Sequence, residues 1–216
     1  MESFERRFGG LRRLYGFDGA QRIFDAHVAV VGIGGVGSWA VEALARSGVR
    51  ELTLIDMDHV SESNFNRQIH AMEPSLGQAK VLALRERIAD LHPGCRDDAV
   101  EAFVEADNWP ALLPCPVDAV VDACDQVRAK ALLASWSRAS RVPVVCVGAA
   151  GGKRRPELLQ NLFFEFRSAL TKRGAFVPPL FVEPLAALPN EPIRAHNTQA
   201  SRRLPPGPAG HGRFDQ

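Results

Sequence analysis

The feature that most constrains the fold is a short apolar run that ends in a cluster of glycines. Residues 28–33 read VAVVGI, and residues 32–37 read GIGGVG. A continuous apolar run of this length is typical of a parallel strand that is buried on both faces. Apolar residues then recur at helical spacing up to Gly48, a residue type that commonly ends helices. The sequence therefore predicts a strand, a tight glycine turn and a helix in succession.

Strands and helices continue to alternate after this first unit. The patterns predict further strands over residues 51–56, 117–123 and 143–149 with a weaker one over 95–104, and helices over 75–91, 108–113 and 127–141. Such alternation is typical of a parallel sheet with right-handed crossovers. We therefore expect an α/β protein with a Rossmann-like three-layer αβα architecture and a mainly parallel sheet.

Three segments differ in character along the chain. Residues 1–26 are expected to form an N-terminal helical arm, and residues 27–160 the Rossmann-like domain itself. Residues 161–216 are expected to be a divergent and largely irregular tail, because eight of the chain's 15 prolines lie in residues 178–216.

Composition excludes several classes of protein. Lys and Arg number 26 against 25 Asp and Glu, so no global field attracts nucleic acid. No apolar run approaches the roughly 18 residues that a membrane-spanning helix needs. The four cysteines form no C-x-x-C pair, which argues against a zinc knuckle and is typical of reduced thiols used as buried filler. We expect a cytoplasmic protein without a membrane segment.

Ligands of open parallel sheets bind beyond the carboxyl ends of the strands. The turn formed by Gly32, Gly34, Gly35 and Gly37 presents backbone N–H groups to phosphate oxygens. Asp56 ends the next strand roughly 20 residues later, where an acidic side chain accepts hydrogen bonds from ribose hydroxyls. These two features fit NAD as well as ATP.

The polar loop after the second strand favours ATP. It carries Asp58, Asn64, Arg67 and Gln68, and Lys80 follows downstream. An amide, a guanidinium and an ammonium group near one glycine turn suit a triphosphate, whereas hydride transfer has no need of them. On charge alone, a surface loop in which Arg67 pairs with Asp58 is the alternative reading.

A metal ligand is expected at the end of the strand over 117–123. Asp125, with Asp122 nearby, offers the hard oxygen that Mg²⁺ prefers when it bridges phosphates. The sequence thus predicts Asp125 as the ligand of a magnesium ion bound together with ATP.

Four segments resemble a known family. GIGGVGSWAVEALARSG, LTLIDMDHVSESNFNRQIHA, GQAK and VVDACD are similar to the ThiF, MoeB and HesA group, which shares its ATP-binding fold with ubiquitin-activating enzymes. RFGGLRRLYG near the N-terminus and NRQIHA look most like the tRNA threonylcarbamoyladenosine dehydratase branch. The resemblance covers residues 6 to 160, and the chain beyond it departs from the family's pattern.

The resemblance implies a role for each matching polar residue. In this reading Asp56 binds ribose, Asn64, Arg67 and Lys80 bind the phosphates, Gln68 braces the loop and Asp125 holds Mg²⁺. It also implies a homodimer in which an N-terminal arginine, Arg7 or Arg13, reaches the partner's ATP.

For the activity, the resemblance implies that ATP adenylates the side-chain carboxylate of threonylcarbamoyladenosine in tRNA, which then closes into a cyclic form. Arg67, Lys80 and Mg²⁺ would neutralise charge on the α-phosphate. The implied partners are tRNA as substrate, a second copy of the chain and a sulfur-relay protein.

Three other functions remain open from the sequence. One is adenylation of the C-terminus of a ubiquitin-like sulfur carrier, although the paired C-x-x-C motifs and transfer cysteine of such enzymes are missing. Another is a truncated nucleotide-binding remnant without catalysis, which the divergent tail favours. The last is an NAD-dependent dehydrogenase. The basic residues Lys153, Arg154 and Arg155 are read as a solvated surface run rather than a tRNA contact.

Overall fold

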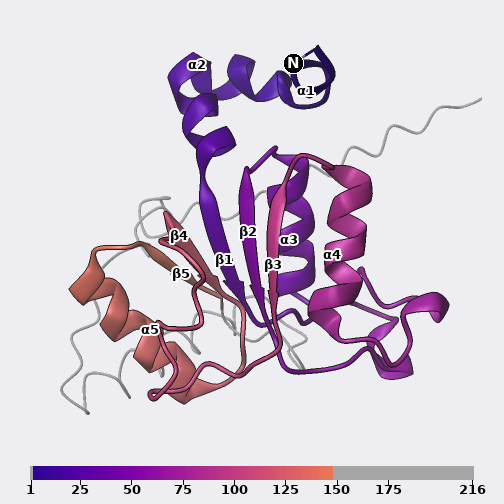
Figure 1. The fold of residues 1–216 in the computed structure, drawn as a ribbon, viewed down its shortest axis with the longest axis vertical. Helices are drawn as coiled ribbons and strands as arrows, with labels where there is room; N and C mark the ends of the chain where they lie inside the picture. The colour runs from indigo at the N-terminus through magenta and orange to yellow at the C-terminus, as the bar shows by residue number, and fades with distance from the viewer. Residues whose placement is uncertain (1, 148–216) are drawn as a thin grey trace, which may run out of the picture. The chain divides into compact units, whose positions relative to one another are not determined.

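The centre of the protein is a five-stranded parallel sheet (Figure 1). The computed structural model describes residues 2–147, so the predictions for 148–216 lie outside the described residues. The strands are β1 His27–Val31, β2 Glu51–Ile55, β3 Arg96–Val100, β4 Ala119–Asp122 and β5 Val144–Cys146. Their order in the sheet is β3-β2-β1-β4-β5. The chain thus winds outward from β1 in both directions, which is the doubly wound order.

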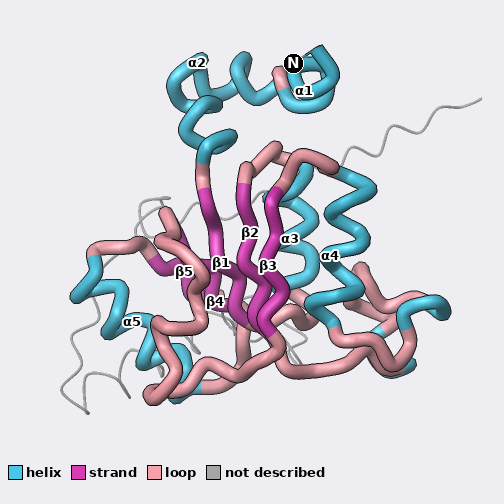
Figure 2. The backbone as a smooth tube through the Cα atoms, in the orientation of Figure 1, coloured by secondary structure: helices cyan, strands magenta, loops and turns pink. Residues whose placement is uncertain are grey.

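Helices cover both faces of this sheet (Figure 2). The described helices are α1 Glu2–Phe8, α2 Gly10–Asp25, α3 Gly37–Arg46, α4 Lys80–Leu91 and α5 Val127–Ser140, with 3-10 turns η1 Glu62–Asn64 and η2 Glu73–Ser75. Helices α3 and α4 pack on one face, and α5 packs on the other. The predicted three-layer αβα class is confirmed.

Alternate residues of β1 enter two separate hydrophobic cores. Val28 and Val30 pack with residues of α3 and α4. Ala29 and Val31 pack on the opposite face with residues of α5 such as Leu133. Burial of an aliphatic side chain stabilises the fold by about 1.5–3 kcal/mol. Because both faces are covered, every position of β1 must be apolar or tightly paired, which explains the continuous run in the sequence.

Helix α4 begins later than the sequence pattern predicted. The expected start was near Ser75, but that residue ends the short η2 turn and the helix starts at Lys80. Gly77 lies between them with a φ of 78°, which is left-handed backbone that a helix does not contain. Ala79 is extended and forms an antiparallel bridge with His59. The late start places Lys80 in the first turn of the helix.

The short helix predicted over 108–113 is wrong. The segment forms consecutive turns with hydrogen bonds such as Trp109 N–H to the Glu105 carbonyl and Leu112 N–H to the Asn108 carbonyl. Pro110 has no N–H to continue a helical ladder. The strand predicted over 95–104 is also shorter, since β3 ends at Val100.

The two N-terminal helices precede the amino end of β1 (Figure 1). Phe8, Ala20 and Phe24 form a small core of their own there. Gly16 interrupts α2 with a φ of 73°. The division of the chain at residues 26 and 160 stays a prediction. Among the described helices, none combines the length and apolar character that a membrane crossing requires.

Candidate nucleotide-binding site

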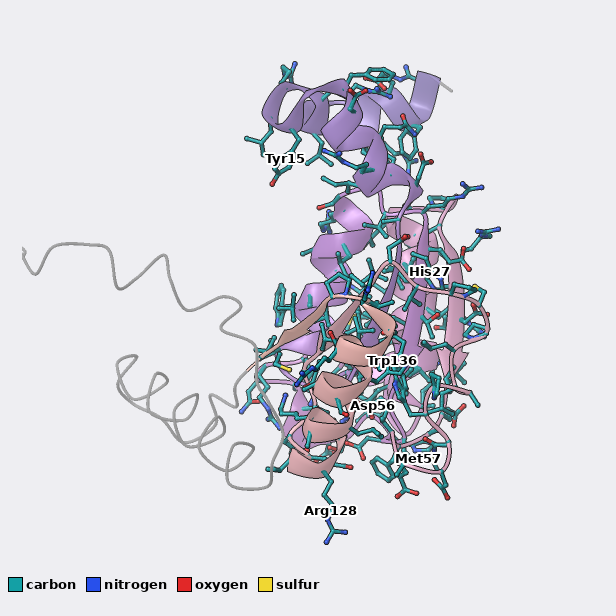
Figure 3. The ribbon with its side chains drawn as sticks, turned by 90° about the vertical axis from the view of Figure 1, so that its left-hand side faces the viewer. Tyr15, His27, Asp56, Met57, Arg128 and Trp136 are labelled. Atoms are coloured by element: carbon teal, nitrogen blue, oxygen red, sulfur yellow. The ribbon has the colours of Figure 1, made fainter. Side chains whose placement is uncertain are left out.

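A cavity of about 620 Å³ opens at the carboxyl ends of β1, β2 and β4. Nine of the residues singled out in the sequence line it: Gly32, Gly34, Gly35, Asp56, Asp58, Arg67, Gln68, Lys80 and Asp125. Figure 3 shows Asp56 and Met57 at this end of the sheet, with Tyr15 of α2 at the other end. The cavity therefore occupies the edge of the sheet at which the sequence predicts a ligand.

The four glycines of the turn differ in what an added Cβ would meet. At Gly32 the φ is 87°, and an added Cβ would lie 2.6 Å from the backbone nitrogen of Cys124. At Gly37 a Cβ would lie 1.8 Å from the Gly32 carbonyl oxygen. These two glycines let α3 and the end of β4 approach the turn closely. Gly34 and Gly35 line the cavity, and a Cβ at Gly34 would meet no atom within 4 Å.

The carboxylate of Asp56 ties the glycine turn to the loop after β2. Its Oδ2 accepts a hydrogen bond from the backbone N–H of Ile33 at 2.5 Å. Its Oδ1 accepts one from the backbone N–H of Asp58 at 2.8 Å. Each carboxylate oxygen has a second lone pair that can accept a further bond. Asp56 thus orders the cavity wall and keeps acceptor capacity for a ligand hydroxyl.

Arg67 lies across the glycine turn. Its aliphatic chain passes Gly35, where a Cβ would lie 3.3 Å from Cγ and Cδ of the arginine. Its Nη1 donates to the Ser63 carbonyl at 2.7 Å and to Oδ1 of Asn66 at 2.8 Å. The indole N–H of Trp39 on α3 donates to the Arg67 carbonyl at 3.0 Å. Both ends of the residue are held, so the guanidinium is placed at the cavity before any ligand arrives.

Lys80 supplies a second positive charge from the first turn of α4. Its Nζ lies 2.7 Å from Oδ2 of Asp58, and its backbone N–H donates to the Asp58 carbonyl at 3.0 Å. The lysine side chain is 7% exposed, whereas that of Asp58 is 59% exposed. A helix N-terminus adds partial positive charge at the same place. The arrangement is suited to an anionic ligand.

Asn64 and Gln68 differ in their position relative to the cavity. Asn64 does not line the cavity, and its Oδ1 accepts the backbone N–H of Ser61 at 3.0 Å. This bond connects Asn64 to the start of η1, and the contact of Asn64 with phosphates stays a prediction. Gln68 lines the cavity, is 5% exposed, and its Oε1 has no hydrogen-bond partner among the described residues.

The two aspartates after β4 differ completely in environment. Asp125 is exposed at the cavity wall. Asp122 is fully buried, and its Oδ1 lies 3.0 Å from Nζ of Lys130 on α5. The charge of Asp122 is thus compensated inside the protein, and the role of Asp125 as a metal ligand stays a prediction. Lys130 was not predicted from the sequence. It could have been noticed because it is a charged residue among the apolar positions of a helix.

Cys124 is not poised as a nucleophile, although it lines the cavity. Burial, together with the neighbouring charge of Asp122 and a hydrogen bond to it, raises the pKa of the Cys124 thiol to about 12. A thiol with such a pKa is protonated at neutral pH and reacts slowly. Cys124 therefore offers no reactive thiolate at the cavity wall.

Arg7 and Arg13 lie away from the cavity of their own chain. Nη1 of Arg7 donates to the carbonyl of Leu91, the last residue of α4, at 3.2 Å. Arg13 is exposed on α2, a helix that precedes the amino end of β1. Contact of either arginine with a partner's ligand stays a prediction.

Sequence reasoning missed an apolar wall. Ala102, Phe103 and Val104 line the cavity directly after β3, and Phe103 is 46% exposed. An exposed aromatic ring beside a cavity offers a surface for a flat, weakly polar group. These residues could have been predicted from their place directly after a strand, because the segments that follow parallel strands all lie at the same edge of the sheet.

The doubly wound sheet and the cationic cavity at its glycine turn together define a Rossmann-like nucleotide-binding protein. The particular family follows from comparison with known sequences. The profile of the ThiF family matches residues 7–157, and the chain belongs to this family.

Named relatives agree with this assignment. The chain is 47% identical over 159 residues to the tRNA threonylcarbamoyladenosine dehydratase of Escherichia coli, an alignment that covers 74% of this chain and 59% of the relative. It is 42% identical over 160 residues to the enzyme of the same name from Haemophilus influenzae, covering 74% and 61%. The chain thus spans about three fifths of the length of these relatives.

Solved structures show the same likeness. The E. coli tRNA N6-threonylcarbamoyladenosine dehydratase TcdA, solved in complex with ATP, superposes with a TM-score of 0.71 at 42% identity. The superposition covers 79% of this chain and 76% of that one. A structure of TcdA with AMP superposes with a TM-score of 0.70.

Proposed function

We propose that this chain binds ATP with Mg²⁺ in the cavity and uses it to dehydrate threonylcarbamoyladenosine in tRNA. The observation that carries the proposal is that Arg67 and Lys80 line the same cavity as the open glycine Gly34. The relatives named for this reaction, one of them solved with ATP and with AMP, support it.

The reaction begins with attack of the substrate carboxylate on the α-phosphorus of ATP. A bond forms between the carboxylate oxygen and phosphorus, and the bond to the β-phosphate oxygen breaks, so that pyrophosphate leaves. A nucleophile of the same threonylcarbamoyl group then attacks the acyl carbon, its proton passes to solvent, and AMP departs as the acyl–oxygen bond to phosphate breaks. The net change in the substrate is loss of one water, whose oxygen ends on AMP.

The cavity assists mainly through charge. Arg67 grips phosphate oxygens with a planar set of donors, and Lys80 adds a compact charge that Asp58 holds in place before ATP binds. Positioned charges of this kind lower the barrier without reorganising during the reaction. Phe103 and its neighbours offer a wall for the adenine ring, and Asp56 accepts hydrogen bonds from the ribose.

The residues present fit a magnesium ion. Mg²⁺ is typically held by one or two carboxylates together with substrate phosphates and water. Asp125 is an exposed carboxylate at the cavity wall, and Asp122 is withdrawn by Lys130. Asp125 would hold the ion, which supplies further neutralisation of phosphate charge.

A second function keeps support from one comparison. The chain is 36% identical over 133 residues to the E. coli molybdopterin-synthase adenylyltransferase, which covers 62% of this chain. The same cavity would then adenylate the C-terminal carboxylate of a ubiquitin-like protein. The sequence holds no C-x-x-C pair, which is the feature that we expect in such enzymes.

The experiment is one incubation of purified protein with ATP, Mg²⁺ and tRNA that carries threonylcarbamoyladenosine. Nucleoside mass analysis follows the loss of water, and AMP is measured in the same sample. We expect one AMP for each dehydrated nucleoside. Nucleotide binding without either product contradicts the dehydratase proposal, and AMP formed only with a ubiquitin-like carrier favours the second function.

Two variants test the assignment of the site. Arg67→Ala and Asp125→Ala should each lower the rate of AMP formation by about 10²–10³, the usual cost of removing one transition-state contact. Arg22→Ala is the control, because Arg22 is exposed on α2. Full activity in both Arg67→Ala and Asp125→Ala would contradict the assignment of the cavity as the active site.

Dimer formation, a sulfur-relay partner and a cytoplasmic location remain part of the proposal. If an N-terminal arginine acts in the partner's site, the Arg13→Ala or Arg7→Ala variant should be inactive alone, as should Arg67→Ala. In a mixed dimer of the two variants, one site combines an intact Arg67 from one chain with an intact N-terminal arginine from the other. The mixture should therefore regain activity. Absence of any recovery with either N-terminal variant would contradict that role.

A further inference from the structure

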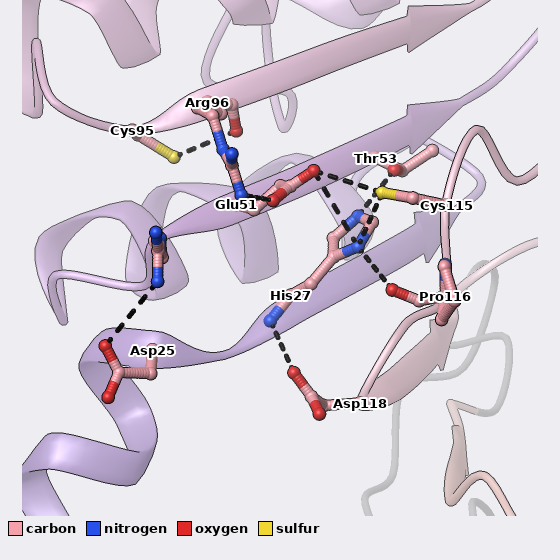
Figure 4. Close-up of polar contacts among 10 residues, drawn as sticks. Asp25, His27, Glu51, Thr53, Cys95, Arg96, Cys115, Pro116 and Asp118 are labelled. Carbon is pink, nitrogen blue, oxygen red and sulfur yellow. Dashed lines mark hydrogen bonds and ion pairs between the residues drawn. The ribbon is translucent and has the colours of Figure 1, made fainter.

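Three side chains with different donor atoms meet at the amino end of the sheet (Figure 4). His27 begins β1, Glu51 begins β2, and Cys115 lies in the segment before β4. Nδ1 of His27 lies 3.9 Å from Oε1 of Glu51 and 3.5 Å from Sγ of Cys115, and that Sγ lies 3.2 Å from Oε1 of Glu51. The cluster lies at the opposite end of β1 from the cavity, about 13 Å away along the strand.

These separations match those of ligands around one metal ion. Zinc lies about 2.0–2.3 Å from imidazole nitrogen, carboxylate oxygen and thiolate sulfur, so ligand atoms of a tetrahedral site are roughly 3.3–3.8 Å apart. The three measured distances, 3.9, 3.5 and 3.2 Å, bracket this range. An ion can therefore enter between the three atoms with small movements of the side chains.

Surrounding residues hold His27 and Glu51 in place. Nε2 of His27 lies 2.8 Å from Oγ1 of Thr53, which is fully buried. The backbone N–H of His27 donates to Asp118 at 2.8 Å, and the other carboxylate oxygen of Glu51 pairs with Arg96. A hydrogen bond to the second ring nitrogen is how proteins usually orient a metal-binding histidine.

We propose that His27, Glu51 and Cys115 form a binding site for a zinc-class divalent cation. Imidazole and thiolate ligands favour Zn²⁺ and Co²⁺, whereas Mg²⁺ prefers oxygen ligands alone. Within the described residues, no fourth His, Cys, Asp or Glu joins the group, so a water molecule completes the tetrahedron. The inference does not depend on the proposed function, because the cluster is remote from the cavity.

Binding replaces two hydrogen bonds of the metal-free protein. In that state the Cys115 thiol donates to Glu51, and Nδ1 of His27 lies 2.9 Å from the Pro116 carbonyl. When the ion binds, the thiol proton passes to solvent. The ring proton moves to Nε2 and is donated to Thr53, so that Nδ1 offers its lone pair. One proton is released for each ion bound, and affinity therefore falls as the pH is lowered.

The metal would link three separate segments of the chain. It would join the starts of β1 and β2 to the loop before β4, and ligands that bind the folded state alone raise its stability. We expect Zn²⁺ to raise the Tm of the full chain. ATP turnover should change little, because the ion lies at the opposite end of the strands from the glycine turn.

The test is titration of the full-length, metal-free protein with Co²⁺, a spectroscopic substitute for Zn²⁺. A thiolate ligand produces a near-ultraviolet charge-transfer band, and tetrahedral geometry produces strong visible bands. Cys115→Ser should lose the charge-transfer band. Cys95→Ser is the matched control, because its thiol lies against the Arg96 carbonyl, outside the three-ligand group, and should leave the band intact.

The expected result is one Co²⁺ per chain, displaced by Zn²⁺ and unaffected by excess Mg²⁺. Glu51→Gln should keep the thiolate band at saturation and weaken Co²⁺ affinity at least tenfold, which tests the site should Cys115→Ser fold poorly. A spectrum without a charge-transfer band, or a band that survives Cys115→Ser, would overturn the proposal. So would a band that Cys95→Ser abolishes.

Discussion

The ammonium nitrogen of Lys80 lies 2.7 Å from a carboxylate oxygen of Asp58, across the whole loop that joins β2 to α4. The lysine side chain is buried and its partner is mostly exposed. Asp58 therefore acts as a solvent-facing counterion that holds a buried positive charge at the cavity. A bound phosphate would share that charge, which gives the pair a purpose beyond the folding of the loop.

Replacement of Lys80 should weaken ATP binding without unfolding the protein. We expect Lys80→Met to raise the Kd for ATP about 10- to 100-fold, the cost of losing one hydrogen bond to a charged group. Arg85→Met on the same helix is the control, since Arg85 lies 3.9 Å from Asp97 and does not line the cavity. Isothermal titration calorimetry measures both, and equal Kd values would contradict the role of Lys80.

Replacement by alanine should affect stability at one glycine of the turn and ATP binding at another. Gly32→Ala places a methyl group 2.6 Å from the Cys124 nitrogen at a φ of 87°, so we expect a loss of several kcal/mol of stability, roughly the upper end of single-residue effects. Gly34→Ala meets no atom within 4 Å and should leave the Tm unchanged. It should weaken ATP binding, because its methyl group enters the cavity. Thermal unfolding and nucleotide titration separate the two effects, and a similar Tm for both variants would contradict the packing role of Gly32.

The buried pair of Asp122 and Lys130 should show strong coupling. Lys130→Met leaves the Asp122 carboxylate uncompensated inside the protein, at a cost of about 3–5 kcal/mol. The double variant Asp122→Asn with Lys130→Met should recover much of that loss. Urea unfolding of the two single variants and the double variant gives the coupling free energy. A double variant that is as unstable as the sum of the singles would contradict this interpretation.

Stability should fall in mildly acidic solution because of His70. Burial lowers the pKa of His70 from 6.5 to about 4, and the charges of Lys80 and Arg87 act in the same direction. Between these values the unfolded chain binds a proton that the folded chain does not bind. The free energy of unfolding therefore rises as the pH increases from about 4 to 6.5. As the pH falls through the same window, the protein loses this stability, at most about 3 kcal/mol from His70.

His70→Leu should flatten this dependence. Both ring nitrogens of His70 lack hydrogen-bond partners among the described residues, so an apolar replacement removes no bond seen there. The exposed His59→Gln serves as the control. Urea unfolding at several pH values compares the slopes. Some dependence will remain, because burial and Arg7 also lower the pKa of His92. An unchanged slope in His70→Leu would contradict the assignment to His70.

The sequence by itself determined the elements that depend on local patterns. The buried run before Gly32 and the helical spacing after it predicted β1, the turn and α3, because burial on both faces requires continuous apolar residues. Parallel strands end at the same edge, so the positions of Asp56 and Asp125 at that edge also followed from their place after strands. The late start of α4 did not follow, since the left-handed backbone at Gly77 interrupts a pattern that still looks helical.

Only the tertiary structure decided which distant residues meet. Lys130 neutralises Asp122 because α5 packs back over the end of β4, and Phe103 reaches the cavity because β3 ends beside β2. His27 and Cys115 come together at the other end because β1 pairs with β4. The spacing of residues along the chain predicts none of these contacts. Each depends on the crossovers that bring separate segments to one edge of the sheet, and therefore on the packing of the whole domain.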